Sequence, residues 1–575
     1  MTSTNTFTVT AGYSGGAERR GPVTIGQANM IRCILRDDPV HINIHDVWPV
    51  PAGTRLESVV EALRTLVLRH EALRTTFALG PDGLHSEQVV AAEGEFTLTV
   101  VDHQVLPEDS WRYAESVARQ ARHGRFRLDR EFPLRLTVIT AAGAPTYTVL
   151  AASHAVADAG AIAVLREEWL ALLAGRELPP LTALTPIELA AAEATPEGQR
   201  KSQSSLRHWE QIIRTGPQAV FAEPGAEGVE GKHPQLTLRS RRAALALARA
   251  ARRTGSPPAT VLLTAWCTLI GHRAGQTSCV VAVPTSNRFQ AGLARTVGTL
   301  SQDALLRLDL AVPSFDALLR KAWGAALNAY RHSTFDSVRL WEMIDRTTFE
   351  RGSSFARDVV FNDVSALPAT LVSTADWDRA EPELELSWGP DQVLPTRVLA
   401  FAYQHDPLLH LSIWADPALF TREEAENFLL GLVRLLEAVG TVDVPFDSLT
   451  GLTGVRPAER GADWTGVDGC WVSPPAVARA LGTALGGLPV HVTADDPVGP
   501  DGGPGLTAYI AAGDTVLTPA GAHTALMKAL PGRPGVLAPH RYVIVQDPPA
   551  GAGTWAQQQV LVEGNGRERP VGHDD

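Results

Sequence analysis

A histidine and an aspartate four residues apart, His154 and Asp158, are the residues of this chain best suited to acid–base chemistry. Near neutral pH an imidazole can accept a proton from an amine or a hydroxyl, or orient that group by a hydrogen bond. We therefore expect His154 to act on a nucleophile and Asp158 to hold the shape of the loop. A lone histidine near an aspartate is more often a structural pair, so other segments must decide the function.

Two strands and a helix are expected to position this pair. Alternating apolar residues predict a strand over 133–140, and a run rich in β-forming residues predicts a second strand over 146–152; a turn over 141–145 joins them. Apolar residues at helical spacing predict a helix that begins near Gly160. Adjacent strand residues point to opposite faces, so Ser153 is poorly placed to act as a nucleophile beside the histidine.

Five segments in fixed order resemble the motifs of the condensation domains of nonribosomal peptide synthetases. The second matches the family pattern Arg-His-Glu-x-Leu-Arg-Thr-x-Phe at every specified position. The third corresponds to His-His-x-x-x-Asp-Gly, with Ser153 in place of the first histidine. The five segments are Thr24–Met30, Arg69–Phe77, Ser153–Ala159, Val297–Arg307 and Arg357–Asn362.

This resemblance covers about residues 23 to 440 and implies an α/β fold of two lobes, each like chloramphenicol acetyltransferase. The lobes are expected to form a V with a central tunnel at His154, and the small residues around His154 are expected to leave room for it. We expect a flexible N-terminus over 1–20, an N-terminal lobe over 21–210 and a C-terminal lobe over 211–445.

The resemblance also implies roles for individual residues. Asp158 is expected to be a structural brace paired with an arginine, Arg74 as first candidate and Arg288 as second. Gly160 directly follows Ala159, which replaces the glycine of the motif, and is expected to supply the same backbone freedom. The candidates for the tunnel or substrate side are Ser153, Gln302 and Asn362.

The implied activity joins an acyl or aminoacyl thioester, carried on phosphopantetheine, to an amine acceptor through an amide bond. The sequence contains no Gly-Gly-x-Ser attachment motif, so an acyl or peptidyl carrier protein is expected in trans and no cofactor is expected on the chain itself. The amine could be a small molecule or carrier-bound. Two alternatives remain open: an ester-forming acyltransferase with an alcohol acceptor, and a catalytically inactive scaffold that binds carrier proteins or partner enzymes.

Residues 446–575 are rich in glycine and proline and resemble the small α+β C-terminal subdomain of adenylate-forming enzymes. The resemblance rests on Asp468–Val477, Gly505–Tyr509 and Pro539–Val545. No Gly-Lys follows Pro549, and the sequence has neither a Gly-rich phosphate loop nor a large adenylation core. Acid activation therefore lacks electrostatic support, and we expect a docking or structural module.

Composition narrows the class of partner and site. The net charge is −12 without a long basic run, which argues against nucleic acid, and no segment approaches ~18 consecutive apolar residues, which argues against a membrane partner. The cysteines lie far apart, which argues against a zinc site or a disulfide framework and favours a cytoplasmic protein. They are Cys33, Cys267, Cys279 and Cys470.

A possible metal site is suggested only weakly by His41, Asn43 and His45, which alternate as on one face of a strand. No third ligand is near in the sequence, so we favour the interpretation that these side chains line the tunnel or the core.

Overall fold

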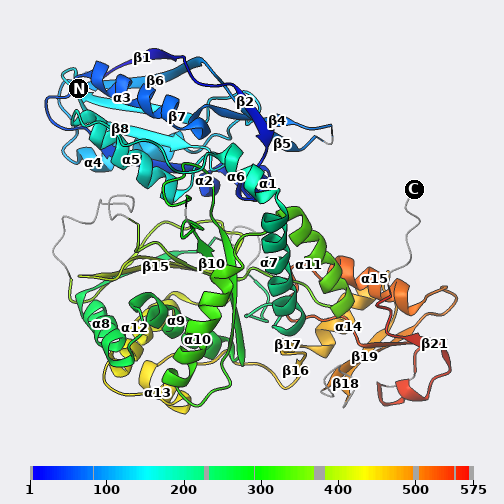
Figure 1. The fold of residues 1–575 in the computed structure, drawn as a ribbon. Helices are drawn as coiled ribbons and strands as arrows, with labels where there is room; N and C mark the ends of the chain where they lie inside the picture. Colours follow the sequence, from blue (N-terminus) through cyan, green and yellow to red (C-terminus); the bar gives the residue numbers. More distant parts are fainter. Residues whose placement is uncertain are drawn as a thin grey trace.

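The computed structural model of the chain describes residues 4–81, 83–225, 232–290, 292–367, 382–495, 504–549 and 552–568. Figure 1 shows an N-terminal lobe, a C-terminal lobe and a smaller C-terminal module beside the second lobe. This is the two-lobed α/β architecture with an α+β tail that the sequence predicts. Within the described ranges, no helix combines the length and apolar character that a bilayer crossing requires.

A five-stranded sheet in the order β1-β6-β7-β8-β3 forms the centre of the N-terminal lobe, and β2-β5-β4 form a smaller sheet. Successive strand residues face opposite sides, so Val138 packs with α3 and α5 while Ile139 packs with α4. The elements are β1 (Thr4–Tyr13), β2 (Arg19–Pro22), α1 (Ile25–Arg36), α2 (Pro39–Ile42), β3 (Ile44–Pro49), α3 (Leu56–Arg69), η1 (Glu71–Arg74), β4 (Thr75–Leu79), β5 (His85–Val90), β6 (Gly94–His103), α4 (Ser110–Ala121), β7 (Leu134–Ala141), β8 (Ala144–Ala152), α5 (Ala159–Leu173) and α6 (Pro186–Glu193).

A seven-stranded sheet in the order β11-β10-β12-β14-β15-β9-β13 forms the centre of the C-terminal lobe. Helices α8, α9, α10 and α12 pack against one face of this sheet and form with it the largest apolar core among the described residues. On the other face of the sheet, α7 and α11 pack against Val280 and Leu305. The elements are α7 (Pro196–Thr215), β9 (Gln235–Ser240), α8 (Arg241–Thr254), α9 (Pro258–Ala274), β10 (Ser278–Thr285), β11 (Gln302–Asp309), α10 (Phe315–Arg331), α11 (Ser337–Arg351), β12 (Val359–Asp363), β13 (Glu385–Trp388), β14 (Val398–Gln404), β15 (Leu409–Ala415), α12 (Arg422–Val439), η5 (Phe446–Ser448) and α13 (Leu449–Thr453).

The C-terminal module contains a four-stranded sheet, β18-β19-β20-β21, and packs against the second lobe. The buried amide of Gln218 donates to the carbonyls of Pro534 and Val536 at 2.6 and 2.8 Å, and the indole of Trp471 donates to Gly275 O at 2.7 Å. These contacts fix the module on the lobe. Its elements are β16 (Thr465–Val467), β17 (Cys470–Val472), α14 (Pro474–Ala484), β18 (Val490–Asp495), β19 (Gly505–Ala511), α15 (Pro519–Ala529), β20 (Arg541–Val545), η6 (Ala552–Gln557) and β21 (Val560–Gly564).

The N-terminus differs from the expectation of a flexible segment over residues 1–20. Residues 4–13 form β1, which pairs with β6 along its whole length. Apolar side chains alternate with threonines from Phe7 to Ala11, and this period of two is typical of a strand. The polar composition of the segment misled the prediction; residues 1–3 lie outside the described part.

The structure places both lobe borders differently from the sequence. The predicted border at 210/211 falls inside α7, whose Trp209 and Ile213 pack against Leu305 of the C-terminal lobe. The predicted border at 445/446 precedes Leu449 and Val455, which pack in the core of the same lobe. Helix α7 therefore belongs to the second lobe, and that lobe extends to about residue 455.

Candidate active site at the lobe interface

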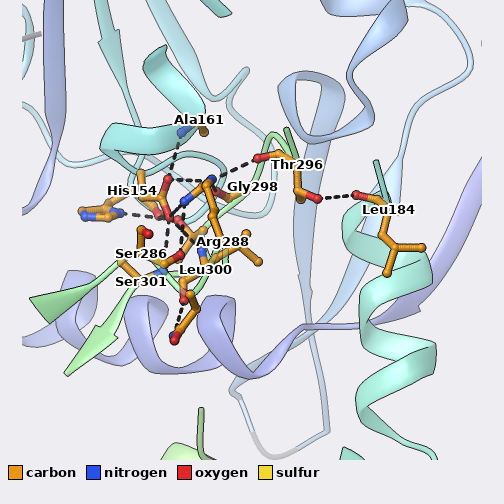
Figure 2. A network of polar contacts seen from close by, with 12 residues as sticks. His154, Ala161, Leu184, Ser286, Arg288, Thr296, Gly298, Leu300 and Ser301 are labelled. Atoms are coloured by element: carbon orange, nitrogen blue, oxygen red, sulfur yellow. Dashed lines mark hydrogen bonds and ion pairs between the residues drawn. The ribbon is translucent and has the colours of Figure 1, made fainter. Parts of the chain in front are cut away.

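His154 lies in the turn between β8 and α5, where the sequence predicts it. The hairpin that carries it turns through Ala142 and Gly143, whose positive φ angles of 47° and 80° suit a tight two-residue turn. The hydroxyl of Thr299, from the other lobe, donates to His154 O and lies 3.4 Å from Nδ1 of the ring. The candidate site is therefore assembled by both lobes (Figure 2).

Burial lowers the pKa of the His154 imidazole below its ordinary value, although the negative charge of Asp158 opposes this shift. The ring is therefore neutral at neutral pH and can accept a proton. The residue nevertheless keeps partial solvent exposure. This combination suits a general base.

Asp158 caps helix α5 and joins the two lobes. Its Oδ1 accepts a hydrogen bond from Ala161 N at 2.9 Å, and its Oδ2 accepts from Leu300 N at 2.9 Å and Ser301 N at 3.2 Å. Arg288 completes the site with a bidentate ion pair at 2.7 and 2.8 Å. Burial raises the pKa of Asp158, but Arg288 and the backbone donors outweigh burial and hold that pKa below its usual range.

Arg74, the first candidate for this ion pair, is not the partner. Its guanidinium donates to the carbonyls of Ala17 and Ala91 within the N-terminal lobe and lies against Gly16. The second candidate, Arg288, holds Asp158 instead. The motif match around Arg74 therefore did not identify the partner, because backbone carbonyls of its own lobe bind Nη1 of this arginine.

The other charged residues of the second motif also have structural partners. His70 Nε2 and Glu168 Oε2 are 2.7 Å apart, and Arg69 Nε donates to the same oxygen at 3.0 Å. Arg295 reaches across from the C-terminal lobe and donates to Glu168 Oε1 at 3.2 Å. Burial alone would raise the pKa of Glu168, but these partners lower it to about 2. The motif thus stabilises the packing of the lobes rather than lining the site.

Gly160 serves a different purpose from the expected backbone freedom. It lies within α5, and its φ is outside the left-handed region that favours glycine. A Cβ at this position would lie 2.7 Å from Nη1 of Arg288, which is held by Asp158. The glycine therefore makes room for the guanidinium.

Replacing Gly160 by alanine is expected to displace Arg288 and lower the free energy of unfolding by about 1–3 kcal/mol, as overpacking does. Urea denaturation measures the effect. Gly324→Ala is the matched control, since Gly324 also lies within a helix but has no atom within 4 Å of an added Cβ. The crowding account fails if Gly160→Ala is as stable as the control variant.

Two of the three tunnel or substrate-side candidates are wrong. Ser153 is 1% exposed and its hydroxyl accepts from Ala155 N at 3.4 Å. Gln302 is 4% exposed, and both ends of its amide bind the backbone of Phe335, at 3.0 and 3.2 Å. Neither side chain is available to a substrate. Asn362, half-buried in β12, stays a candidate.

Most of the small residues around His154 do not leave the expected room. Four alanines near His154 are fully buried, and three of these belong to the core of the N-terminal lobe. Their small size allows close packing of the turn. The tunnel to His154 from both sides stays a prediction of the family resemblance. The four are Ala151, Ala152, Ala155 and Ala157.

Sequence reasoning missed Thr299, which the second lobe brings to His154. Thr299 is 2% exposed, and Gly26 of the N-terminal lobe packs so close to Thr299 O that an added Cβ would collide with it. Gly26 belongs to the first motif and Thr299 to the fourth. Their places in the motifs were the available signal, but nothing in the spacing shows that the two segments meet.

The weak metal alternative is not supported. The three residues do not share a strand: His41 falls in α2, Asn43 lies between α2 and β3, and only His45 is on β3; the side chain of His41 lies outside the described part of the chain. The ring of His45 contacts Glu115 at 3.2 Å, and Asn43 donates to backbone carbonyls. No group of three or more His, Cys, Asp or Glu residues in the described ranges could hold a metal ion.

Comparison with known proteins places this geometry in a family. The family model described as Condensation domain matches residues 32–449. Chondramide synthase cmdD from Chondromyces crocatus is 27% identical over 334 residues, covering 56% of this chain and 8% of that protein. The chain spans only a small part of the curated relatives it matches: 4%, 8% and 29% of three of them.

Solved structures share the fold of the two lobes. SgcC5 from Streptomyces globisporus has a TM-score of 0.56 at 21% identity, covering 74% of this chain and 100% of that chain. The X-domain of teicoplanin biosynthesis, in a complex with OxyB, has a TM-score of 0.56 at 18% identity, covering 75% and 96%. Because the family model matches well over half of its residues, this chain belongs to the condensation-domain family of nonribosomal peptide synthetases.

Proposed function

We propose that the chain is a condensation enzyme that forms an amide bond between an acyl or aminoacyl thioester and an amine. The thioester is carried on the phosphopantetheine of a separate acyl or peptidyl carrier protein. The single observation that carries this proposal is the placement of His154: a partly exposed imidazole at the lobe interface, in contact with Thr299 and four residues before the Asp158–Arg288 pair that joins the lobes.

The reaction requires one proton acceptor beside the attacking amine. The amine nitrogen attacks the thioester carbonyl carbon while His154 accepts its proton, and a tetrahedral intermediate forms. This intermediate collapses, the carbon–sulfur bond breaks, and the thiolate of the phosphopantetheine arm leaves and takes up the proton. Arg288 and three backbone amides donate hydrogen bonds to the two carboxylate oxygens of Asp158, so these oxygens are not available to accept from a substrate. The proposed role of Asp158 is therefore to hold the turn and the two lobes together.

The proposal is tested with acyl-pantetheine thioesters offered with an amine, with an alcohol or with no acceptor. Thiol release is followed by absorbance and the product by mass spectrometry. Amide formed above the rate without protein supports the proposal. Ester formed with the alcohol alone would support the ester-forming alternative, and thiol release that never exceeds the rate without protein would argue for a scaffold.

The scaffold is kept as a second candidate because Ser153 replaces the first histidine of the motif and is buried. A fold likeness to the X-domain, whose structure is a complex with OxyB, gives this candidate a precedent of partner binding. The retained His154 and Asp158 favour the enzyme. A cytoplasmic location, the absence of a bound cofactor and a structural role for the adenylation-like tail remain predictions.

The tail is expected neither to bind ATP nor to activate an acid. The reason is the missing lysine, together with the contacts of Gln218 and Trp471 that fix the module on the second lobe. Exchange of labelled pyrophosphate into ATP, measured with the full chain and a panel of carboxylic acids, should stay at background. Exchange above background with any acid would contradict this assignment of the tail.

A further inference from the structure

Asn287 directly precedes Arg288, the residue of the second lobe that pairs with Asp158. Its φ of 55° lies in the left-handed region, which asparagine enters more readily than most residues with a side chain. The residue is 4% exposed. Because β10 ends at Thr285, the turn at Asn287 decides where the chain leaves the sheet and where the Arg288 side chain begins.

Both ends of the buried Asn287 amide have partners on other segments of the second lobe. Its Nδ2 donates to Leu300 O at 2.9 Å and to Ser333 O at 3.1 Å. Its Oδ1 accepts from the hydroxyl of the fully buried Ser333 at 2.6 Å. The amide therefore ties the end of β10 to the segment before β11 and to the residues that follow α10.

The first two of these segments are the ones that bind Asp158. Arg288 supplies the ion pair at 2.7 and 2.8 Å, and Leu300 N donates to the same carboxylate at 2.9 Å. Leu300 thus binds Asp158 through its N–H and Asn287 through its carbonyl oxygen. Figure 2 shows Arg288, Leu300 and Ser301 gathered in one network of polar contacts. A displacement of Asn287 would therefore shift both the guanidinium and the backbone donors of Asp158.

We propose that Asn287 is a positioning residue that sets Arg288 and the Leu300 amide against Asp158 and thereby fixes the turn that carries His154. A glycine would permit the same backbone turn, but it has no amide to join the segments. The position of Arg288 is a property of the folded chain, whereas its consequence for the rate rests on the proposed function. The two can be measured separately.

The position of Arg288 is read from the titration of His154. Among the described residues, the charge that acts on the His154 ring is that of Asp158, which Arg288 balances from the second lobe. The other partners of the ring are uncharged: the Thr299 hydroxyl and the carbonyls of His154 and Ala157. A displaced Arg288 leaves the charge of Asp158 less balanced, so the pKa of His154 should rise. NMR titration of the His154 ring, assigned by loss of its signal in His154→Gln, measures this pKa without turnover.

The test compares Asn287→Gly and Asn287→Ala with the wild-type full chain. Glycine adopts the left-handed backbone without strain and removes the amide, so the glycine variant carries the test. It should raise the pKa of His154 and lower kcat with acyl-pantetheine and an amine about tenfold, the value of one ordinary hydrogen bond, with little change in KM. Alanine adds a left-handed Cβ and should raise the equilibrium constant for unfolding about five- to thirtyfold above that of the glycine variant.

Gln218→Ala is the matched control for the loss of a buried amide. Gln218 is 2% exposed and also donates to two carbonyls, Pro534 O and Val536 O, but these contacts join the second lobe to the C-terminal module. This variant should lose resistance to urea as Asn287→Gly does. Because the site is distant, its kcat should stay within about twofold of the wild type and the pKa of His154 should not change.

A wild-type kcat together with a wild-type His154 pKa in Asn287→Gly overturns the inference. A lower kcat with an unchanged pKa also overturns it, because Arg288 would then not have moved. An equal loss of kcat in Gln218→Ala would reduce Asn287 to a residue that only stabilises the fold. A raised pKa in a chain that transfers no acyl group upholds the positioning role and overturns the proposed function instead.

Discussion

Replacing His154 by alanine is expected to lower the rate of amide formation by about 10² to 10⁴, because this is the usual loss when a general base is removed. The fold should persist, since the side chain is partly exposed and makes one long contact of 3.4 Å with another side chain, Thr299. The measurement is single-turnover amide formation, with circular dichroism to check folding. The residual rate then reports what binding and proximity alone contribute.

His85→Ala is the matched control for the loss of an imidazole. His85 is also partly buried in the N-terminal lobe, and its ring lies 2.7 Å from the carbonyl of Phe77, far along the chain from the turn that carries His154. This control should retain the wild-type rate. A His154→Ala variant within a few fold of the wild type would remove His154 from the chemistry and favour the binding scaffold.

Replacing Asp158 by alanine is expected to be the most destabilising single change near the site. It removes the cap of α5 and leaves Arg288 buried without its counter-ion, and breaking a buried ion pair in this way costs about 3–5 kcal/mol. Soluble yield, the free energy of unfolding in urea and the activity should all fall.

Two further variants make this prediction specific. Asp309→Ala removes a carboxylate from the exposed ion pair with Lys321 and should cost no more than about 1 kcal/mol. The double variant Asp158→Ala/Arg288→Met should recover part of the lost stability, because no unpaired charge remains buried. If Asp158→Ala unfolds like the wild type and is inactive, Asp158 has a direct chemical role and the brace assignment is wrong.

Local sequence patterns predicted the elements that carry the candidate site. The period of two over β7, the β-forming residues of β8 and the helical spacing of α5 placed His154 in a turn between a strand and a helix. Asp158 at the start of that helix acts as its cap, as aspartate commonly does. These features depend on neighbouring residues, which is why one sequence was sufficient.

Contacts between distant segments were not predictable in the same way. Arg288 contacts Asp158 and Thr299 contacts His154, although each pair is more than a hundred residues apart in the sequence. No periodicity in the sequence indicates which of the two candidate arginines pairs with Asp158. Gly160 shows the same limit: its missing side chain makes room for Arg288, so its purpose depends on a residue of the other lobe. Gln302 was a candidate by motif position, yet the backbone of Phe335 occupies its amide.

The most direct test of the central claim follows one acyl group from a carrier protein to an amine. A carrier protein loaded with an acyl-phosphopantetheine is mixed with excess full chain and an amine, quenched over time and analysed by intact-protein mass spectrometry. The account predicts that the carrier loses the mass of the acyl group, that an equal amount of amide appears, and that His154→Ala slows both about 10² to 10⁴-fold. Loss of the acyl group at the same rate with wild type, with His154→Ala and without protein would contradict it.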